Sequence, residues 1–450
     1  MFSYILVMVC IFAACFFYLR YKNIYNPPFL MGVFWAVITL FSTFGLYNQE
    51  VADEKTYGVC LIGMLGFFCG SLLNRKIVLH HKRKSNAREL NQQVTAVIAN
   101  SKFITFILIV LAVILFQRVI RVMVILSSGI QMNQIRVDFN NIVLSSSFER
   151  ALNTYIIMPL IYLLPVIVIP EFIAFRKQIK NLVLTIIVLV EFTICDGGRA
   201  PFFYCAIYVV CSLYIFHVDF KNVIVTLRSK SRRTKRLTLI VAIAVVAVAG
   251  YMILRLSTSR SIQYSLGNSI YTYFTGCFPF LEYNLNRIDQ NNVWTYGSAF
   301  FHGVLNIVFY LLNAANICTY PEFYNYVHEW GNVQEFIHIG SANFNAFVTP
   351  FYYFYMDFRY LGVAMGGAIY GIISTQIYLR MKKQSVYHYK YIAAYMLIIQ
   401  SIVTSMVRWQ FYNANFVMAF VILMLFPSRR GQPEYTLIGG TNRHENKIPR

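Results

Sequence analysis

The sequence predicts an all-α polytopic integral membrane protein with about eleven transmembrane helices and a long, partly helical loop on the outer side. Of the 450 residues, 58% are hydrophobic and only 13% are charged, whereas soluble domains carry roughly 25% charged residues. The apolar residues form blocks of about 16 to 24, near the roughly 17 to 25 that a helix needs to cross a bilayer. Basic loops alternate with acidic or neutral ones, as expected of a chain that crosses a membrane repeatedly.

The apolar blocks define the predicted spans, whose boundaries are uncertain by a few residues. The first block carries no basic residue before it and is followed by Arg20 and Lys22 rather than a small-residue cleavage site, so we expect it to stay as a helix. The predicted spans are 2–19, 29–47, 57–73, 103–126, 152–175, 182–195, 201–216, 237–256, 360–379, 391–407 and 411–426.

Basic residues set the predicted orientation, because Lys and Arg concentrate in cytoplasmic loops. The segments 75–88, 228–236 and 380–383 are the most basic connections. Placing them inside puts the N-terminus outside and the C-terminus in the cytoplasm. The chain then divides into an N-terminal bundle of eight helices (1–256), a large outer loop (257–351), three C-terminal helices (352–427) and a basic cytoplasmic tail (428–450).

The basic residues on the two sides differ in type. By this assignment 28 of the 39 basic residues lie inside, 14 Lys and 14 Arg. The net charge of +21 therefore follows the topology and does not indicate a nucleic-acid partner. Outside lie Lys55 and ten arginines: Arg118, Arg121, Arg136, Arg150, Arg199, Arg255, Arg260, Arg287, Arg359 and Arg408. Arginine presents a planar fork of donors that suits phosphate and carboxylate groups. The alternative is that these arginines pair with the outer acids Glu149, Glu191, Asp196 and Asp357.

The outer loop is too long to be a simple connection and rich in aromatic residues, so we expect it to be folded. Two of its stretches, 269–285 and 299–317, are apolar enough to enter the membrane. If both crossed, the chain would have thirteen spans with the same orientation. We favour interfacial or re-entrant helices.

Several outer arginines stand where an anion could bind. Arg118 and Arg121 are three residues apart on one face of the fourth span, and Arg118 lies roughly 12 Å below its outer end at ~1.5 Å per residue. Arg199 belongs to the tight Asp196–Pro201 turn, where free N–H groups at the next helix start favour an anion. The remaining candidates are Arg136, Arg255, Arg260 and Arg408.

Few residues in the outer loop suit proton transfer, and no motif for a bound cofactor is present. His338 and His328 are the histidines that can titrate there, although a lone His is more often structural. Phosphate-binding loops, nucleophile elbows and metal-ligand spacings are absent from the sequence. We therefore expect no cofactor and no metal.

Three features together resemble the oligosaccharide repeat-unit polymerases of the O-antigen (Wzy) type. The turn Cys195-Asp196-Gly197-Gly198-Arg199 resembles the family's S-G-x-R turn. The segment from Asn343 to Pro350, followed by Tyr355-Met356-Asp357-Phe358 and Gly362, resembles its N-x-x-T…y-x-D-F-G…G passage. The layout, with one long periplasmic loop before the last three spans, is also similar. The motifs are short, and Arg359 stands where the family often has Gly.

The resemblance implies a GT-C-like, metal-independent glycosyltransferase of the bacterial inner membrane that builds O-antigen or capsule polysaccharide. Such an enzyme transfers a growing glycan from undecaprenyl pyrophosphate to another lipid-linked repeat unit at the periplasmic face, beside membrane lipid and a chain-length regulator protein. It implies pyrophosphate binding by the outer arginines, with catalytic roles for Arg199 and Arg260. His338 is the first candidate base, and Asp357 is the second.

Two other functions fit parts of the pattern. A lipid-linked oligosaccharide flippase would line a central cavity with arginines, but the sequence shows no two-halves repeat and has one long outer loop. An O-antigen ligase is the nearest enzyme alternative.

Overall fold

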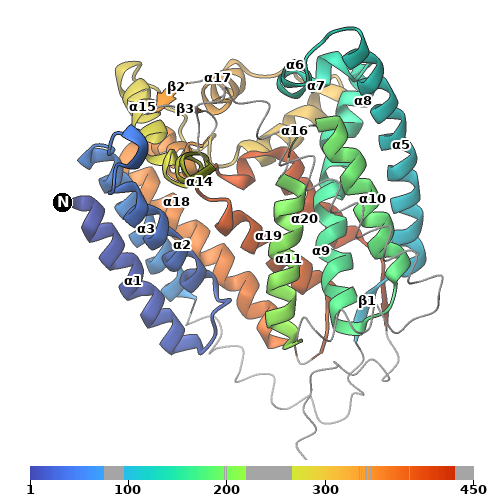
Figure 1. Cartoon of the computed structure of the whole chain (residues 1–450), viewed down its shortest axis with the longest axis horizontal. Coiled ribbons are helices and arrows are strands. Elements are labelled where there is room, and N and C mark those ends of the chain that lie inside the picture. The colour runs from blue at the N-terminus through green and yellow to red at the C-terminus, as the bar shows by residue number, and fades with distance from the viewer. Residues whose placement is uncertain are drawn as a thin grey trace, which may run out of the picture.

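The computed structural model describes residues 1–74, 96–196, 198, 200–218, 266–333, 335, 337–339, 342–344, 347–384 and 386–430. The described chain is mostly helical, which confirms the predicted all-α membrane class (Figure 1). Five helices are long and apolar enough to cross a membrane by length and composition, and shorter apolar helices accompany them. Helices occupy ten of the eleven predicted spans; the range 237–256 lies outside the described residues.

Two groups of helices pack side by side (Figure 1). The first contains α1 (Phe2–Tyr21), α2 (Pro27–Ser42), α3 (Glu54–Leu73) and α18 (Thr349–Lys383) around one apolar core. The second contains α5 (Ser101–Ser127), α9 (Met158–Phe175), α10 (Ile179–Asp196), α11 (Ala200–Phe216), α19 (Tyr389–Val403) and α20 (Ala414–Leu425) around another.

Polar caps fix where several of these helices begin. The Asn26 side chain accepts from Phe29 N at 2.9 Å and starts α2, and Asp53 accepts from Thr56 N at 2.7 Å and starts α3. Asn100 caps α5 in the same way. Each cap satisfies N–H groups that the first helical turn leaves without a partner.

The closest helix pair, α3 with α18, meets along glycines. A Cβ on Gly70 would strike the carbonyl oxygen of Ala368, and one on Gly367 would strike that of Gly63. Small residues at these positions let two helix backbones approach directly, which is how helices associate when lipid is as apolar as their side chains.

The helix α18 consists of two pieces that lie side by side. Phe358 and Arg359 have non-helical backbone angles, so residues 349–357 and 360–383 are separate segments. A Cβ on Gly362 would meet the carbonyl oxygen of Phe354, although eight residues of straight helix would separate them by about 12 Å. The chain therefore reverses at residues 358–359. We call residues 349–357 the half-helix; its N-terminus points into the protein.

The helices α19 and α20 are too short to cross a bilayer core. They contain 15 and 12 residues, or about 22 and 18 Å of a hydrocarbon core of about 30 Å. The predicted spans 391–407 and 411–426 are therefore shorter in the structure. The intervening residues 404–413, which we call the Arg408 turn, contain only the short 3-10 helix η3 (Gln410–Tyr412). Irregular backbone at membrane depth is tolerated where protein buries it or a wet cavity meets it.

Short helices and hairpins close the two ends of the bundle. At one end lie α6 (Met132–Val137), α7 (Phe139–Ile142), α8 (Ser147–Leu152), the π-helix η2 (Asn153–Ile157), α14 (Leu266–Thr275), α15 (Cys277–Gln290), α16 (His302–Ala314), α17 (Glu322–Gly331) and the hairpin of β2 (Ile337–Ile339) with β3 (Ala342–Phe344). At the other, β1 (Val97–Ala99) pairs antiparallel with β4 (Ser428–Arg430). We call these the loop end and the basic end, and the basic turn 380–383 belongs to the second (Figure 1).

The two apolar stretches of the outer loop are short helices. Gly276 divides the first between α14 and α15, of 10 and 14 residues, and α16 has 13. Each helix is about 15 to 21 Å long, less than a bilayer core of about 30 Å. These lengths agree with the interfacial or re-entrant arrangement favoured from the sequence.

Candidate functional site

The N-terminus of the half-helix has a strained backbone conformation. Thr349 has a positive φ of 62°, which a β-branched residue rarely adopts. Its side chain is fully buried, and its hydroxyl has no hydrogen-bond partner among the described residues. Strained residues of this kind cluster at binding and catalytic sites. Pro350 has no N–H group and Thr349 is bridged to Arg408, so only the remaining N–H groups of the first turn can attract negative charge.

Arg408 lies directly beside this helix start. Thr349 and Arg408 form a parallel β-bridge, and Val348 N donates to Val407 O at 2.9 Å. Arg408 is half-buried and makes no ion pair with any carboxylate that the structure describes. A half-buried arginine beside a helix N-terminus concentrates positive charge at one point. A bound anion would balance this positive charge, because no described carboxylate pairs with Arg408.

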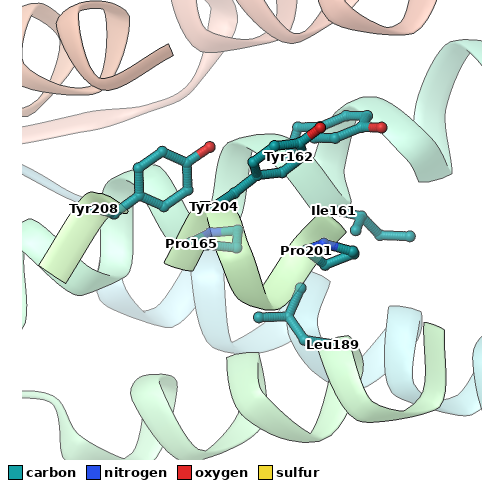
Figure 2. Close-up of a pocket in the computed structure, with 7 residues that line it drawn as sticks. All are labelled: Ile161, Tyr162, Pro165, Leu189, Pro201, Tyr204 and Tyr208. Carbon is teal, nitrogen blue, oxygen red and sulfur yellow. The ribbon is translucent and has the colours of Figure 1, made fainter. Parts of the chain in front are cut away.

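Phenols surround Arg408 on two sides. Its guanidinium lies within electrostatic reach of Tyr162, Tyr204, Tyr353 and Tyr412. Tyr162 and Tyr204 also line a small pocket with Ile161, Pro165, Leu189, Pro201 and Tyr208 (Figure 2). In Figure 2, the hydroxyl groups of Tyr162, Tyr204 and Tyr208 lie on the side of the pocket that faces the C-terminal helices, which are drawn in faint orange-red. The pocket holds about 10 Å³, room for about one water, so it is too small to be a substrate cavity.

The Asp196–Pro201 turn, singled out in the sequence, joins this region. Asp196 and Arg408 both act electrostatically on Tyr162, and Pro201 lines the same small pocket. Arg199 itself, and Arg255 and Arg260, lie outside the described residues, as does the side chain of Arg136. Of the predicted arginine set, the structure therefore places Arg408, Arg118 and Arg121.

Arg118 and Arg121 have different surroundings although they share a helix face. Arg118 is only 5% exposed, and its Nη1 donates to Asn153 Oδ1 at 2.6 Å. Arg121 pairs with Glu149 through contacts of 3.0 and 3.2 Å. Acid pairing therefore accounts for Arg121, whereas Arg118 is a buried cation whose hydrogen-bond partner is a neutral amide. The π-helix η2 directs Asn153 toward it.

Other outer basic residues are held by carboxylates at the loop end. Arg287 contacts Glu335 at 2.6 Å, and Lys55 contacts Asp289 at 2.6 Å. Arg359 Nε lies 3.3 Å from Asp289 Oδ1. These pairs tie α3, α15 and the reversal of α18 together. Among the described outer arginines, Arg408, Arg118 and Arg150 make no ion pair with a described carboxylate, and Arg150 Nη1 donates to Asn141 Oδ1 at 3.0 Å.

Asp357, a candidate base, accepts four hydrogen bonds. Its Oδ1 accepts from Thr295 Oγ1 at 2.5 Å, Gly297 N at 2.9 Å and Ala299 N at 3.0 Å, and its Oδ2 accepts from Phe300 N at 2.9 Å. The residue is 3% exposed. These bonds join the carboxylate to four successive parts of the 295–300 segment. The geometry favours a structural role that fixes residues 295–300 to the half-helix.

His338, the other candidate base, is exposed on the β2–β3 hairpin, where it pairs in register with Asn343. His302 is different: it is 3% exposed and stacks between Tyr412 at 4.0 Å and Tyr324 at 5.1 Å between ring centroids. Its Nδ1 lies 3.0 Å from Tyr412 O, and its Nε2 is buried without a partner among the described residues.

The Tyr412 carbonyl fixes the proton of His302, because a carbonyl can only accept. Nδ1 therefore carries the hydrogen of the neutral ring, and Nε2 carries a free lone pair. Burial lowers the pKa of His302 to about 4, so the ring is neutral at physiological pH. Desolvation also lowers the pKa of the neighbouring His328. The Arg408 turn thus carries a cation at its centre and contacts a neutral imidazole near its C-terminal end.

Thr349 and His302 were not candidate site residues in the sequence. Thr349 lies in the segment that resembles the N-x-x-T passage, although three residues separate it from Asn345 and nothing in the pattern indicates a positive φ. His302 begins an apolar stretch and has no sequence neighbour that suggests catalysis. Its environment is created by Tyr412, 110 residues later.

No protein-family model, curated protein or solved structure matches this chain. The functional argument therefore rests on the geometry described above together with the residues of the sequence motifs.

Proposed function

We propose that this protein is a polysaccharide polymerase that transfers a growing glycan from undecaprenyl pyrophosphate to another lipid-linked repeat unit. The observation that carries the proposal is the strained Thr349 at the half-helix N-terminus, beside Arg408 without a carboxylate partner among the described residues. Helix N–H groups, a guanidinium fork and nearby phenols are complementary to a diphosphate.

The depth of the site supports a lipid-linked substrate. The Arg408 turn begins where α19 ends, about 22 Å from the basic end of that helix. A diphosphate attached to a lipid tail enters such a site from the bilayer or its outer interface. A freely soluble sugar nucleotide has no comparable means of reaching this depth.

The proposed reaction replaces the glycosyl-phosphate bond of the donor with a new glycosidic bond to the acceptor. The bond between the donor's anomeric carbon and the pyrophosphate oxygen breaks, and undecaprenyl pyrophosphate leaves with the electron pair. The acceptor hydroxyl forms the new bond to the anomeric carbon and gives its proton to a base. Arg408 and the half-helix N-terminus stabilise the charge that develops on the leaving oxygen.

Among the described histidines, His302 is the one whose geometry suits that base. Its Nε2 lone pair is unused, and its tautomer is fixed by the same turn that presents Arg408. The low pKa keeps the ring neutral before transfer, and the negative diphosphate of a bound substrate would raise that pKa toward a more useful range.

The test is Arg408→Lys in purified protein reconstituted with a lipid-linked repeat unit. Lysine keeps the charge but loses the planar fork, so we expect polymerisation to fall by about 100-fold or more. Arg287→Lys, which alters a loop-end ion pair, is the matched control and should retain activity. Normal chain length from the Arg408→Lys enzyme, with insertion and thermal stability unchanged in both variants, would reject the proposed leaving-group site.

A flippase is the second candidate, and the discontinuous helices favour it. Half-helices that meet near the middle of a bundle also form the substrate sites of secondary transporters. Proteoliposomes that carry a fluorescent lipid-linked oligosaccharide distinguish the two functions. Movement between leaflets without any lengthening of the glycan would support the flippase, whereas lengthening without movement supports the polymerase. An O-antigen ligase would instead require a different acceptor lipid.

A further inference from the structure

A second polar cavity opens at the basic end, away from the Arg408 turn. It has a volume of about 190 Å³, enough for several waters. Its walls come from the end of α11, the end of α18, the start of α19 and the loop after α1. The lining residues are Tyr25, Ile215, Phe216, Met381, Lys382, Gln384, Val386, Tyr387, His388, Tyr391 and Ile392.

The charge of this cavity is one-sided. Lys382 lines it, and none of the described lining residues is Asp or Glu. Lys382 Nζ contacts a backbone oxygen, Tyr21 O, at 3.4 Å rather than a carboxylate. The neighbouring Lys390 points elsewhere and donates to Met424 O at 2.6 Å. A cation in a cavity without an acid is complementary to an anion.

Polar groups in the lining support the same conclusion. The helix α19 begins at Tyr389, and its N-cap residue His388 makes no side-chain cap. His388 Nδ1 is buried without a hydrogen-bond partner among the described residues, and His388 lines the cavity. His388, Tyr391 and Ile392 bring the first turn of the 15-residue helix α19 to the cavity wall, and the parallel bridge between His388 and Val97 fixes the start of that helix.

The apolar part of the lining distinguishes a lipid from a free ion. Ile215, Phe216, Met381 and Ile392 form an apolar part of the wall, and all four belong to helices of the bundle. A free phosphate gains nothing from these side chains, whereas the glycerol and first acyl carbons of a lipid would cover them.

We propose that this cavity binds the phosphate headgroup of an anionic phospholipid from the leaflet at the basic end, which the topology predicts to be cytoplasmic. Lys382, His388 and the α19 N-terminus hold the phosphate, and the apolar wall receives the lipid backbone. Basic pockets between helices on the cytoplasmic side bind anionic headgroups by this chemistry. The site is independent of the glycan-transfer site.

Thermal unfolding of the full-length protein in detergent tests the proposal. The protein is titrated with phosphatidylglycerol, with phosphatidylcholine of the same chain lengths, and with inorganic phosphate. We expect phosphatidylglycerol to stabilise most, and Lys382→Gln to weaken its apparent affinity by about fivefold, the effect of one interfacial lysine. Lys383→Gln is the matched control, because the exposed Lys383 is adjacent but does not line the cavity.

A second variant separates the cavity from general surface charge. Val386→Trp keeps every charge and fills the space, so it should abolish the stabilisation by phosphatidylglycerol. Equal losses from Lys382→Gln and Lys383→Gln, or full binding by Val386→Trp, would overturn the proposal. Stabilisation by inorganic phosphate that depends on Lys382 and displaces phosphatidylglycerol would assign the cavity to a free anion instead.

Discussion

Thr349 and Arg359 lie near the two ends of the half-helix, and both have backbone conformations that ordinary side chains rarely adopt. Thr349 has φ 62°, and Arg359 has φ 52° with ψ −135°, a combination usually reserved for glycine. Each costs about 1–3 kcal/mol, so the surroundings must hold it. At Arg359 this support includes a hydrogen bond to Val293 O at 2.8 Å and the contact with Asp289. The glycine common at this position in the similar family fits the same reversal without side-chain support.

Three substitutions at the residue scale separate the candidate bases: His302→Gln, His338→Gln and Asp357→Asn. We expect His302→Gln to remove most polymerisation in folded protein, because Gln cannot accept and hold the transferred proton. His338→Gln should leave activity within about threefold, since the side chain is exposed on a hairpin. The rate is measured with purified, folded enzyme for each variant.

Asp357→Asn should act on stability, because its amide cannot accept the four hydrogen bonds of the carboxylate. Losing bonds to a buried charge costs roughly 1.5–3 kcal/mol each, so a large drop in melting temperature is expected. The folded fraction should keep most of its rate. A stable but inactive Asp357→Asn protein would instead identify Asp357 as the base, and an active His302→Gln enzyme would remove His302.

At the scale of elements, the close packing of α3 against α18 predicts which glycines tolerate a larger side chain. Gly367→Leu should separate the two helices, because even a Cβ at this position strikes the backbone of Gly63. Overpacking of this kind costs roughly 1–3 kcal/mol or more. Gly58→Leu in α3 is the control, since nothing lies within 4 Å of a Cβ there. Thermal unfolding in detergent should show a clear loss for Gly367→Leu alone; equal stability of both variants would contradict the packing.

The sequence could predict the spans but not how the half-helix folds back. Hydropathy located the span 360–379, whose first residue follows the reversal. Residues 349–357 are rich in Phe and Tyr and were assigned partly to the outer loop, because a segment of this length is too short to cross a bilayer. Only its packing against α3 and Trp35 shows that it enters the bundle; the Phe351 ring lies 5.0 Å from that of Trp35.

At the scale of the molecule, the orientation remains a prediction from charge. Reporter fusions at Arg83, Arg233 and Lys382 should report the cytoplasm, and fusions at Asn292 and Tyr326 should report the outside, because Lys and Arg loops stay inside. A cytoplasmic signal at Tyr326 would place the Arg408 turn on the wrong side for glycan transfer. A cytoplasmic signal at Asn292 alone would favour thirteen spans.

The excess of outer arginines illustrates what composition can and cannot predict about the site. It directed attention to Arg408, which has no carboxylate partner among those described. It could not separate Arg408 from Arg121 or Arg287, which are paired with Glu149 and Glu335. Partner identity depends on which elements lie side by side, and hydropathy does not contain that information.

The bridge between Thr349 and Arg408 has a consequence for biosynthesis. The half-helix emerges from the ribosome some sixty residues before the turn that completes its N-terminal site. Until α19 and the Arg408 turn are inserted, the strained threonine lacks the strand-like neighbour that holds it. The proposed anion site therefore cannot form in a nascent chain until nearly all of the described helices have entered the membrane.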